Sequence, residues 1–174
     1  MRRVVITGGP STGKTCLVNT LNTKGYSTFN EVAREIIKDQ LSIKSDKVPW
    51  KDVTGFSKLV LNKQVNHFNK ALNDLTFYDR GIPDIIGYMN NANKVLFDEL
   101  ITHSKNLRYT HVFILPPWEE IYTTDNERRE SFEEAMKLYK LIYQAYFSLK
   151  YEPIVVPKVD IEERIKFILN TLNE

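Results

Sequence analysis

The stretch Val4-Val5-Ile6-Thr7-Gly8-Gly9-Pro10-Ser11-Thr12-Gly13-Lys14-Thr15 decides the fold. Its part from Gly8 to Thr15 satisfies the pattern G-x-x-x-x-G-K-[ST]. The pattern lies between a short apolar run and an amphipathic stretch that carries Leu17, Val18 and Leu21 on one face. An apolar strand, a glycine-rich turn and a helix in this order form a phosphate-binding loop. The segment therefore predicts a buried parallel strand that leads into a P-loop.

The residue types of this loop suit a polyphosphate and Mg²⁺. Glycines let successive backbone N–H groups point inward, and the helix N-terminus that follows favours anions. We expect Lys14 to place its charge on the β and γ phosphates and Thr15 to offer a hydroxyl ligand to Mg²⁺. The predicted cofactors are ATP and Mg²⁺, with the nucleotide held by Gly8, Gly9, Pro10, Ser11, Thr12, Gly13, Lys14, Thr15 and Cys16.

Apolar runs and amphipathic stretches alternate along the rest of the chain. We expect further strands over 26–29, 75–78, 111–115 and 154–156, and helices over 13–24, 31–40, 53–72, 95–105 and 132–149, besides a short helix opened by Pro83 and a C-terminal one. This alternation indicates βαβ units with right-handed crossovers. The predicted class is α/β, a P-loop NTPase with a five-stranded, mostly parallel sheet, helices on both faces and a kinase-like lid. One domain should span residues 1–174.

Composition narrows the function classes. Lys and Arg are scattered among Asp and Glu and the formal charge is only +2, so no basic face for nucleic acid is expected. The single cysteine, Cys16, cannot form an internal disulfide, which favours a reducing compartment. No segment fits a signal peptide or a membrane span. We therefore expect a cytoplasmic protein that acts on a small molecule, with a protein partner still possible.

Charged residues follow the expected strands at their carboxyl ends, where α/β proteins bind ligands. Asp79 ends the third strand, so we expect it to join Thr15 as a Mg²⁺ ligand, the alternative being a helix cap or a salt bridge with Arg80. Arg80 should point toward the phosphates or back to Glu31. Asp84 lies at a helix start, and the choice between substrate binding and pairing with the helix dipole stays open.

Glu31 and Arg34 follow the second strand, three residues apart, and should share one face of a helix. The functional interpretation makes Glu31 a catalytic base and Arg34 a substrate clamp. The alternative is an intrahelical ion pair of small energetic value. Pro157, which follows the fifth strand, is expected to contact the nucleotide at the same edge of the sheet.

The charged stretch Asp125-Asn126-Glu127-Arg128-Arg129-Glu130 follows the fourth strand, where small kinases carry a lid. Arginine stays protonated and can fork onto phosphate oxygens. We therefore expect Arg128 to neutralise charge on the transferring phosphoryl group, with Arg129 paired to a neighbouring carboxylate. The alternative is a mixed-charge surface loop. Lys14, Glu31, Asp79 and Arg128 are the predicted catalytic residues.

Together these blocks resemble the NadR-like P-loop kinases, which are related to ribosylnicotinamide kinase domains. The matching stretches are Gly8 to Thr15, Glu31-Val32-Ala33-Arg34-Glu35, Tyr78-Asp79-Arg80-Gly81-Ile82-Pro83-Asp84, Leu115-Pro116-Pro117-Trp118, Asp125 to Arg129, and Val156-Pro157. The resemblance implies ATP-dependent phosphoryl transfer to a nucleoside-like acceptor. It makes Glu31 the base for the acceptor's hydroxyl and Arg80 the arginine of an acidic-Arg pair. It implies no particular acceptor.

Two functions fit these observations. The first is a small-molecule kinase, and the second is a nucleotide-dependent regulatory ATPase that acts on a protein partner. A GTPase does not fit, because no Asn-Lys-x-Asp follows a strand. An AAA+ motor does not fit either, because no pair of carboxylates closes the third strand and the chain is too short for a helical lid domain.

Overall fold

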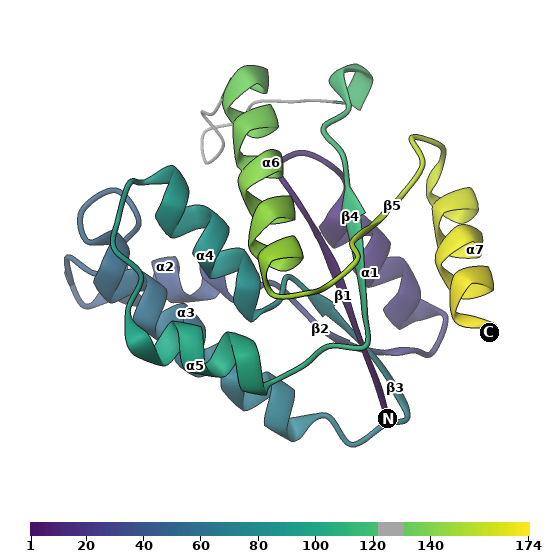
Figure 1. The fold of residues 1–174 in the computed structure, drawn as a ribbon, viewed down its shortest axis with the longest axis horizontal. Helices are drawn as coiled ribbons and strands as arrows, with labels where there is room; N and C mark the ends of the chain where they lie inside the picture. Colours follow the sequence, from purple (N-terminus) through teal and green to yellow (C-terminus); the bar gives the residue numbers. More distant parts are fainter. Residues whose placement is uncertain (122–130) are drawn as a thin grey trace.

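A five-stranded sheet forms the centre of the protein, whose computed structural model describes residues 1–121 and 131–174 (Figure 1). The strands are β1 Arg2–Gly8, β2 Ser27–Phe29, β3 Leu75–Asp79, β4 His111–Leu115 and β5 Ile154–Val155, in the order β2-β3-β1-β4-β5. All pairings between the described strands are parallel. The predicted α/β class and parallel sheet are confirmed.

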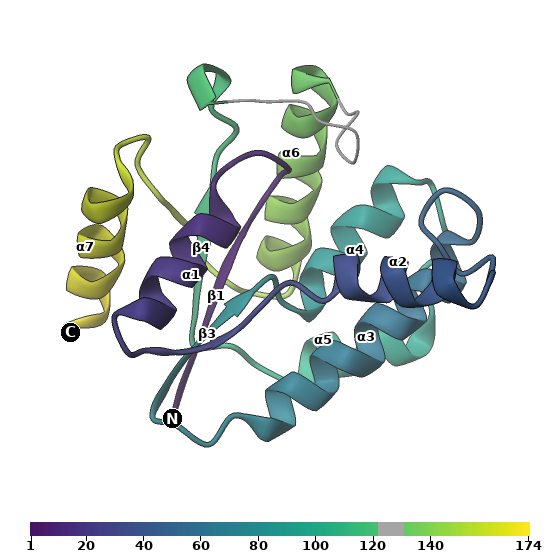
Figure 2. The ribbon, with the colours of Figure 1, turned by 180° about the vertical axis from the view of Figure 1, so that it is seen from behind.

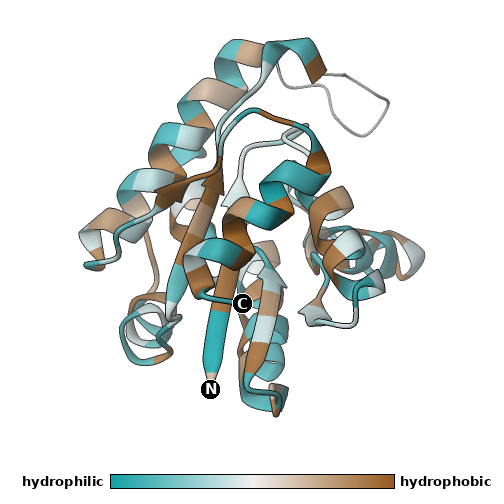
Figure 3. Cartoon of the chain, turned by 90° about the vertical axis from the view of Figure 1, so that its right-hand side faces the viewer, coloured by the Kyte–Doolittle hydropathy of each residue, from teal (hydrophilic) through white to brown (hydrophobic). Residues whose placement is uncertain are grey.

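Helices cover both faces of this sheet, as expected (Figures 1 and 2). Side chains alternate along a strand, so Val4 and Ile6 of β1 face one helical layer and Val5 faces the other. Figure 3 shows the apolar strands between these layers. The helices are α1 Lys14–Thr23, α2 Ala33–Ser42, α3 Val53–Lys70, α4 Ile82–Asn91, α5 Asp98–Asn106, α6 Phe132–Ser148 and α7 Ile161–Leu172, and a short 3-10 helix spans Glu119–Ile121. α1 and α7 pack on one face, whereas α3 and α6 pack on the other.

Of the helix boundaries that differ from the prediction, three bear on the site or on the core. The helix expected over 31–40 begins at Ala33, which leaves Glu31 in the connection after β2. The helix expected over 95–105 begins at Asp98, and Val95 is 90% exposed. The helix expected over 53–72 ends at Lys70, and Leu72 is 84% exposed. In the last two cases an isolated apolar residue in a connection extended the helical pattern without contributing to the core.

The register of the sheet brings the functional segments together. Ile6 of β1 pairs with Asp79 of β3, and Gly8 pairs with Leu115 of β4. The phosphate loop therefore begins beside the turn that follows Asp79. Within residues 1–121 and 131–174, no helix has both the length and the apolarity to cross a membrane.

Helices α4 and α6 approach each other closely at Gly87. A Cβ atom added there would lie 2.8 Å from Cγ1 and 3.0 Å from Cα of Ile142. Because Cα belongs to the backbone, the contact cannot be relieved by a side-chain rotation alone. Any residue larger than glycine would therefore push α6 away from α4.

We predict that Gly87→Ala destabilises the protein by about 1–3 kcal/mol, the usual cost of overpacking a core. The sign of the change in stability is informative, because helix propensity alone favours alanine over glycine by about 1 kcal/mol. Urea unfolding measures the effect. The control is Asn90→Ala on the exposed side of the same helix, which should be neutral or slightly stabilising. A stabilised Gly87→Ala protein would contradict the close approach.

Candidate functional site

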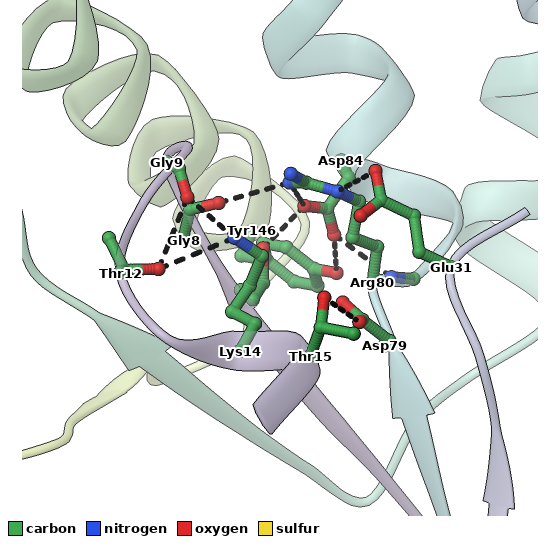
Figure 4. Close-up of polar contacts among 12 residues, drawn as sticks. Gly8, Gly9, Thr12, Lys14, Thr15, Glu31, Asp79, Arg80, Asp84 and Tyr146 are labelled. Atoms are coloured by element: carbon green, nitrogen blue, oxygen red, sulfur yellow. Dashed lines mark hydrogen bonds and ion pairs between the residues drawn. The ribbon is translucent and has the colours of Figure 1, made fainter. Parts of the chain in front are cut away.

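The phosphate loop wraps around the side chain of Lys14. Gly8 has φ +140°, and a Cβ atom there would overlap the Leu115 carbonyl oxygen, so the loop needs glycine at this position. Nζ of Lys14 donates to the Gly9 carbonyl at 2.5 Å and lies 3.3 Å from Oγ1 of Thr12 (Figure 4). The ammonium thus lies inside the loop, where its charge is available to a phosphate.

Burial of Lys14 changes its protonation. The residue is 5% exposed, and this burial, together with the charge of Arg80, lowers the pKa of Lys14 to about 8. Asp79, Glu31 and Asp84 act in the opposite direction without outweighing burial. A bound phosphate would supply the missing negative charge next to the ammonium.

Thr15 and Asp79 meet as the sequence predicts. Oγ1 of Thr15 donates to Oδ2 of Asp79 over 3.2 Å. Oδ1 of Asp79 is buried and has no hydrogen-bond partner among the described residues. Burial raises the pKa of Asp79 above its ordinary value, although the charge of Lys14 opposes the shift. An unpaired buried carboxylate oxygen beside a hydroxyl fits a cation.

The chemistry of this pair fits Mg²⁺ rather than a protein-only metal site. Within the described part of the chain, no group of three or more His, Cys, Asp or Glu residues has an arrangement that could hold a metal ion. Mg²⁺ commonly takes one or two protein oxygens and completes its shell with phosphates and water. Thr15 and Asp79 would hold the ion, which when bound neutralises charge on the β and γ phosphates.

Arg80 connects the phosphate loop to Glu31. Its Nε donates to Oε1 of Glu31 at 3.1 Å, and its Nη1 donates to the Gly8 carbonyl at 3.0 Å and to Oδ1 of Asp84 at 3.4 Å. The ring of Tyr88 lies 5.1 Å from the guanidinium carbon. The backbone of Arg80 has φ +72°, an uncommon conformation for a residue with a side chain. Of the two directions predicted for Arg80, the structure shows the one toward Glu31.

Glu31 is a partly buried carboxylate, with 20% of its side chain exposed, and it stays ionised. Burial raises its pKa, but the charges of Arg80 and Lys14 outweigh burial, so that the pKa of Glu31 lies below its ordinary value. The predicted helical face shared with Arg34 is wrong, because Glu31 precedes α2. Arg34 lies exposed in the first turn of α2, and its charge contributes to the lowered pKa.

Asp84 does not lie where a substrate could reach it. The residue is 2% exposed and its two oxygens accept from Thr7, Arg80, Gly81 and Tyr146. We therefore correct the expectation that Asp84 binds substrate. The helix-start alternative is closer to the structure, because Oδ2 accepts from the backbone N–H of Gly81, the residue that precedes α4.

The remaining predicted contacts lie at the edges of the site. Cys16 is exposed in the first turn of α1, and Pro157 is exposed after β5. Arg128 and Arg129 lie outside the described residues, and so does most of the expected lid.

Arg164 of α7 was not predicted. Its Nη1 donates to the Thr12 carbonyl of the phosphate loop at 3.0 Å, its Nε donates to the Val159 carbonyl at 2.7 Å, and its guanidinium carbon lies 4.8 Å from the ring of Trp118. Arg164 thus braces the loop from the side of α7. The signal available in the sequence was the spacing of Arg164, which shares the apolar face of an amphipathic helix with Ile165 and Ile168.

Comparison with known proteins agrees with this geometry. A family model described as an AAA domain matches residues 3–164. The chain belongs to this AAA-domain family. A search of curated protein sequences found no match. The exclusion of an AAA+ motor rested on chain length and on the single carboxylate that ends β3, and it stays a prediction.

Solved kinase structures share the fold. A deoxyadenosine kinase from M. mycoides with bound dATP is 19% identical, with a TM-score of 0.71 and full coverage of both chains. A thymidylate kinase from Ehrlichia chaffeensis is 14% identical, with a TM-score of 0.66 and 98% of each chain covered. These similarities confirm the P-loop NTPase fold across the length of the chain.

We predict that Asp79→Asn weakens ATP binding in the presence of Mg²⁺ by on the order of tenfold to a hundredfold, the usual effect of disturbing a metal's surroundings. Binding in the presence of a chelator should change little, because asparagine keeps the shape and removes only the charge that attracts the cation. Nucleotide titration under both conditions measures the difference. Asp39→Asn on the exposed face of α2 is the control. Equal losses with and without Mg²⁺ would contradict the assignment.

We also predict that ATP binding takes up a proton above pH 8. The pKa of Lys14 is about 8 in the free protein, and the phosphates should raise it in the complex. Affinity is therefore expected to fall as pH rises through 8, until the pKa of the complex is reached. Calorimetry at pH 7 and pH 9, in buffers of different ionisation enthalpy, measures the uptake.

Lys14→Arg is the control, because a guanidinium keeps its proton over this range. ATP binding to Lys14→Arg should show no proton uptake from this position. A separate variant, Lys14→Ala, removes the charge and should lose catalysis altogether. Proton uptake that persists unchanged in Lys14→Arg would contradict the role of this ammonium.

Proposed function

We propose that this protein is a small-molecule kinase that transfers the γ-phosphoryl group of Mg-ATP to a hydroxyl of a nucleoside-like acceptor. The observation that carries the proposal is the ionised, partly buried Glu31, held by Arg80 next to the loop that contains Lys14. A kinase needs a carboxylate near the phosphate loop to orient the acceptor's hydroxyl, and the charges of Arg80 and Lys14 both act on Glu31.

The chemistry can be assigned to individual groups. The acceptor oxygen attacks the γ phosphorus, the bond to the β–γ bridging oxygen breaks, and ADP leaves. The hydroxyl proton passes to Glu31, whose carboxylate is ionised at neutral pH. Lys14 and Arg80 supply positive charge for the phosphoryl oxygens. Such transfers are largely dissociative, so a weak base that orients the hydroxyl is sufficient.

Several observations favour a nucleoside-like acceptor. The kinases that share the fold are named for deoxyadenosine and thymidylate. The blocks around Glu31 and Arg80 also resemble those of the NadR-like kinases. We further propose that Arg34, at the start of α2, clamps the acceptor, and that Cys16 and Pro157 lie against the nucleotide. A cytoplasmic location suits an ATP-dependent reaction and the single cysteine.

We predict that Glu31→Gln lowers kcat by about a hundredfold or more, the typical contribution of a positioned base. Affinity for Mg-ATP should change little, because glutamine keeps the shape and Lys14 and Thr15 are untouched. The measurement is ADP release from ATP in the presence of a panel of nucleosides, with nucleotide affinity measured separately. The matched control is Glu35→Gln, an exposed glutamate of α2 that pairs with Lys63 outside the site.

The same assay tests the alternative function. Strong stimulation by one nucleoside that is lost in Glu31→Gln supports the kinase. A slow rate that no nucleoside changes, and that Glu31→Gln leaves intact, would instead support a regulatory ATPase that acts on a protein partner.

A further inference from the structure

Asp84 lies at the centre of a buried hydrogen-bond network that joins three parts of the fold (Figure 4). Oδ1 accepts from the Thr7 hydroxyl and from Nη1 of Arg80, the latter at 3.4 Å. Oδ2 accepts from the Gly81 N–H at 2.9 Å and from the Tyr146 hydroxyl at 2.5 Å. Both carboxylate oxygens are thus held by donors within the protein.

The donors come from different elements. Thr7 belongs to β1, Arg80 and Gly81 to the turn between β3 and α4, and Tyr146 to α6. A buried carboxylate is stable only when such donors surround it. Tyr146 is fully buried, so its hydroxyl has no access to water as an alternative partner. The position of α6 therefore influences how Asp84 is held.

Helix α6 is itself packed closely against the site. A Cβ atom at Gly9 of the phosphate loop would lie 3.2 Å from the Ala135 carbonyl oxygen, in the first turn of α6. One turn before Tyr146, Ile142 meets Gly87 of α4. The helix therefore contacts the phosphate loop near its start, and near its end it contacts the carboxylate that holds Arg80.

Arg80 needs such support. Its left-handed backbone is costly for a residue with a side chain, and it persists only where surrounding contacts determine it. Its backbone N–H donates to the Ile6 carbonyl at 3.0 Å, and its guanidinium is held by Glu31, Gly8 and Asp84. Asp84 acts on the same nitrogen, Nη1, that contacts the phosphate loop.

We propose that Tyr146 and Asp84 are positioning residues, and that the hydrogen bond between them orients the Arg80 guanidinium for phosphoryl transfer. The role in phosphoryl transfer rests on the proposed function. The orientation of the Arg80 guanidinium by Asp84 and Tyr146 does not, because it is a property of the protein without substrate. Neither residue needs to touch the nucleotide or the acceptor.

The test removes the Tyr146 hydroxyl and keeps the ring. In Tyr146→Phe, the Nε–H proton of Arg80 should exchange with water about tenfold faster. Asp84 holds the same guanidinium at Nη1, so a less firmly held Asp84 lets the guanidinium shift and loosens the bond from Nε to Glu31. The exchange rate is measured by NMR on protein labelled with ¹⁵N-arginine, and the signal is assigned by its loss in Arg80→Lys. We also expect kcat to fall about tenfold while KM for ATP stays within about twofold.

The matched control is Tyr151→Phe. Tyr151 is another buried tyrosine, its ring packs against that of Tyr146 at 5.5 Å, and its hydroxyl accepts from the backbone N–H of Tyr109 rather than contacting Asp84. Both variants lose one buried hydroxyl, so the loss of thermal stability should be similar. Faster exchange at Arg80 in Tyr146→Phe alone supports the inference. Exchange and kcat that match those of Tyr151→Phe would overturn it.

A failure of the proposed function gives a different result. If no nucleoside accepts a phosphoryl group, the Arg80 exchange rate still reports whether Tyr146 holds the guanidinium. If transfer occurs and the exchange rate does not respond to Tyr146→Phe, the kinase assignment stands and the positioning role is wrong.

Discussion

The pairing of the Arg80 guanidinium with Glu31, Asp84 and the Gly8 carbonyl is the interaction on which the rest of the site depends. Each charge is largely removed from water, and a buried charge that loses its partner is strongly destabilising. The pairing is possible because β1 and β3 are neighbours and end together, with Ile6 opposite Asp79. The order of strands in the sheet therefore determines which charges lie close enough to pair. The phosphate loop is joined to these charges because its Gly8 carbonyl accepts a hydrogen bond from Arg80.

Much of the fold could be predicted because β1 and the loop after it carry strong local signals. The apolar run Val4-Val5-Ile6 and the glycine-rich pattern that begins at Gly8 indicate a buried strand and a loop without knowledge of the rest of the chain. Two of the boundary errors lie where an apolar residue has no partner. Val95 and Leu72 extend a helical pattern but lie exposed, because periodicity reports spacing and not whether an opposing surface exists.

The contacts of the site also separate into those that the sequence predicts and those that it does not. The Thr15–Asp79 contact and the pairing of Arg80 with Glu31 could be predicted, because parallel strands present their carboxyl ends at one edge. Asp79, Arg80 and Glu31 lie at or shortly after such ends, and the phosphate-loop pattern places Thr15 at the start of the helix that follows β1. Tyr146 could not be predicted in its role. It lies 62 residues from Asp84 in the sequence, and its helical spacing indicates only a core position. Its hydroxyl reaches Asp84 only because α6 packs against α4. Arg164 was missed for the same reason.

Charge balance also bears on which groups meet the substrates. Among the described residues at the sheet edge, the cations Lys14 and Arg80 face the carboxylates of Glu31, Asp79 and Asp84. Arg80 already pairs with two of these carboxylates, so Lys14 carries the larger share of the positive charge that these two side chains offer to a triphosphate. Mg²⁺ at Thr15 and Asp79 and the N-terminus of α1 offset part of the phosphate charge. Arg34 is close enough to lower the pKa of Glu31, so its positive charge also acts on this group of carboxylates.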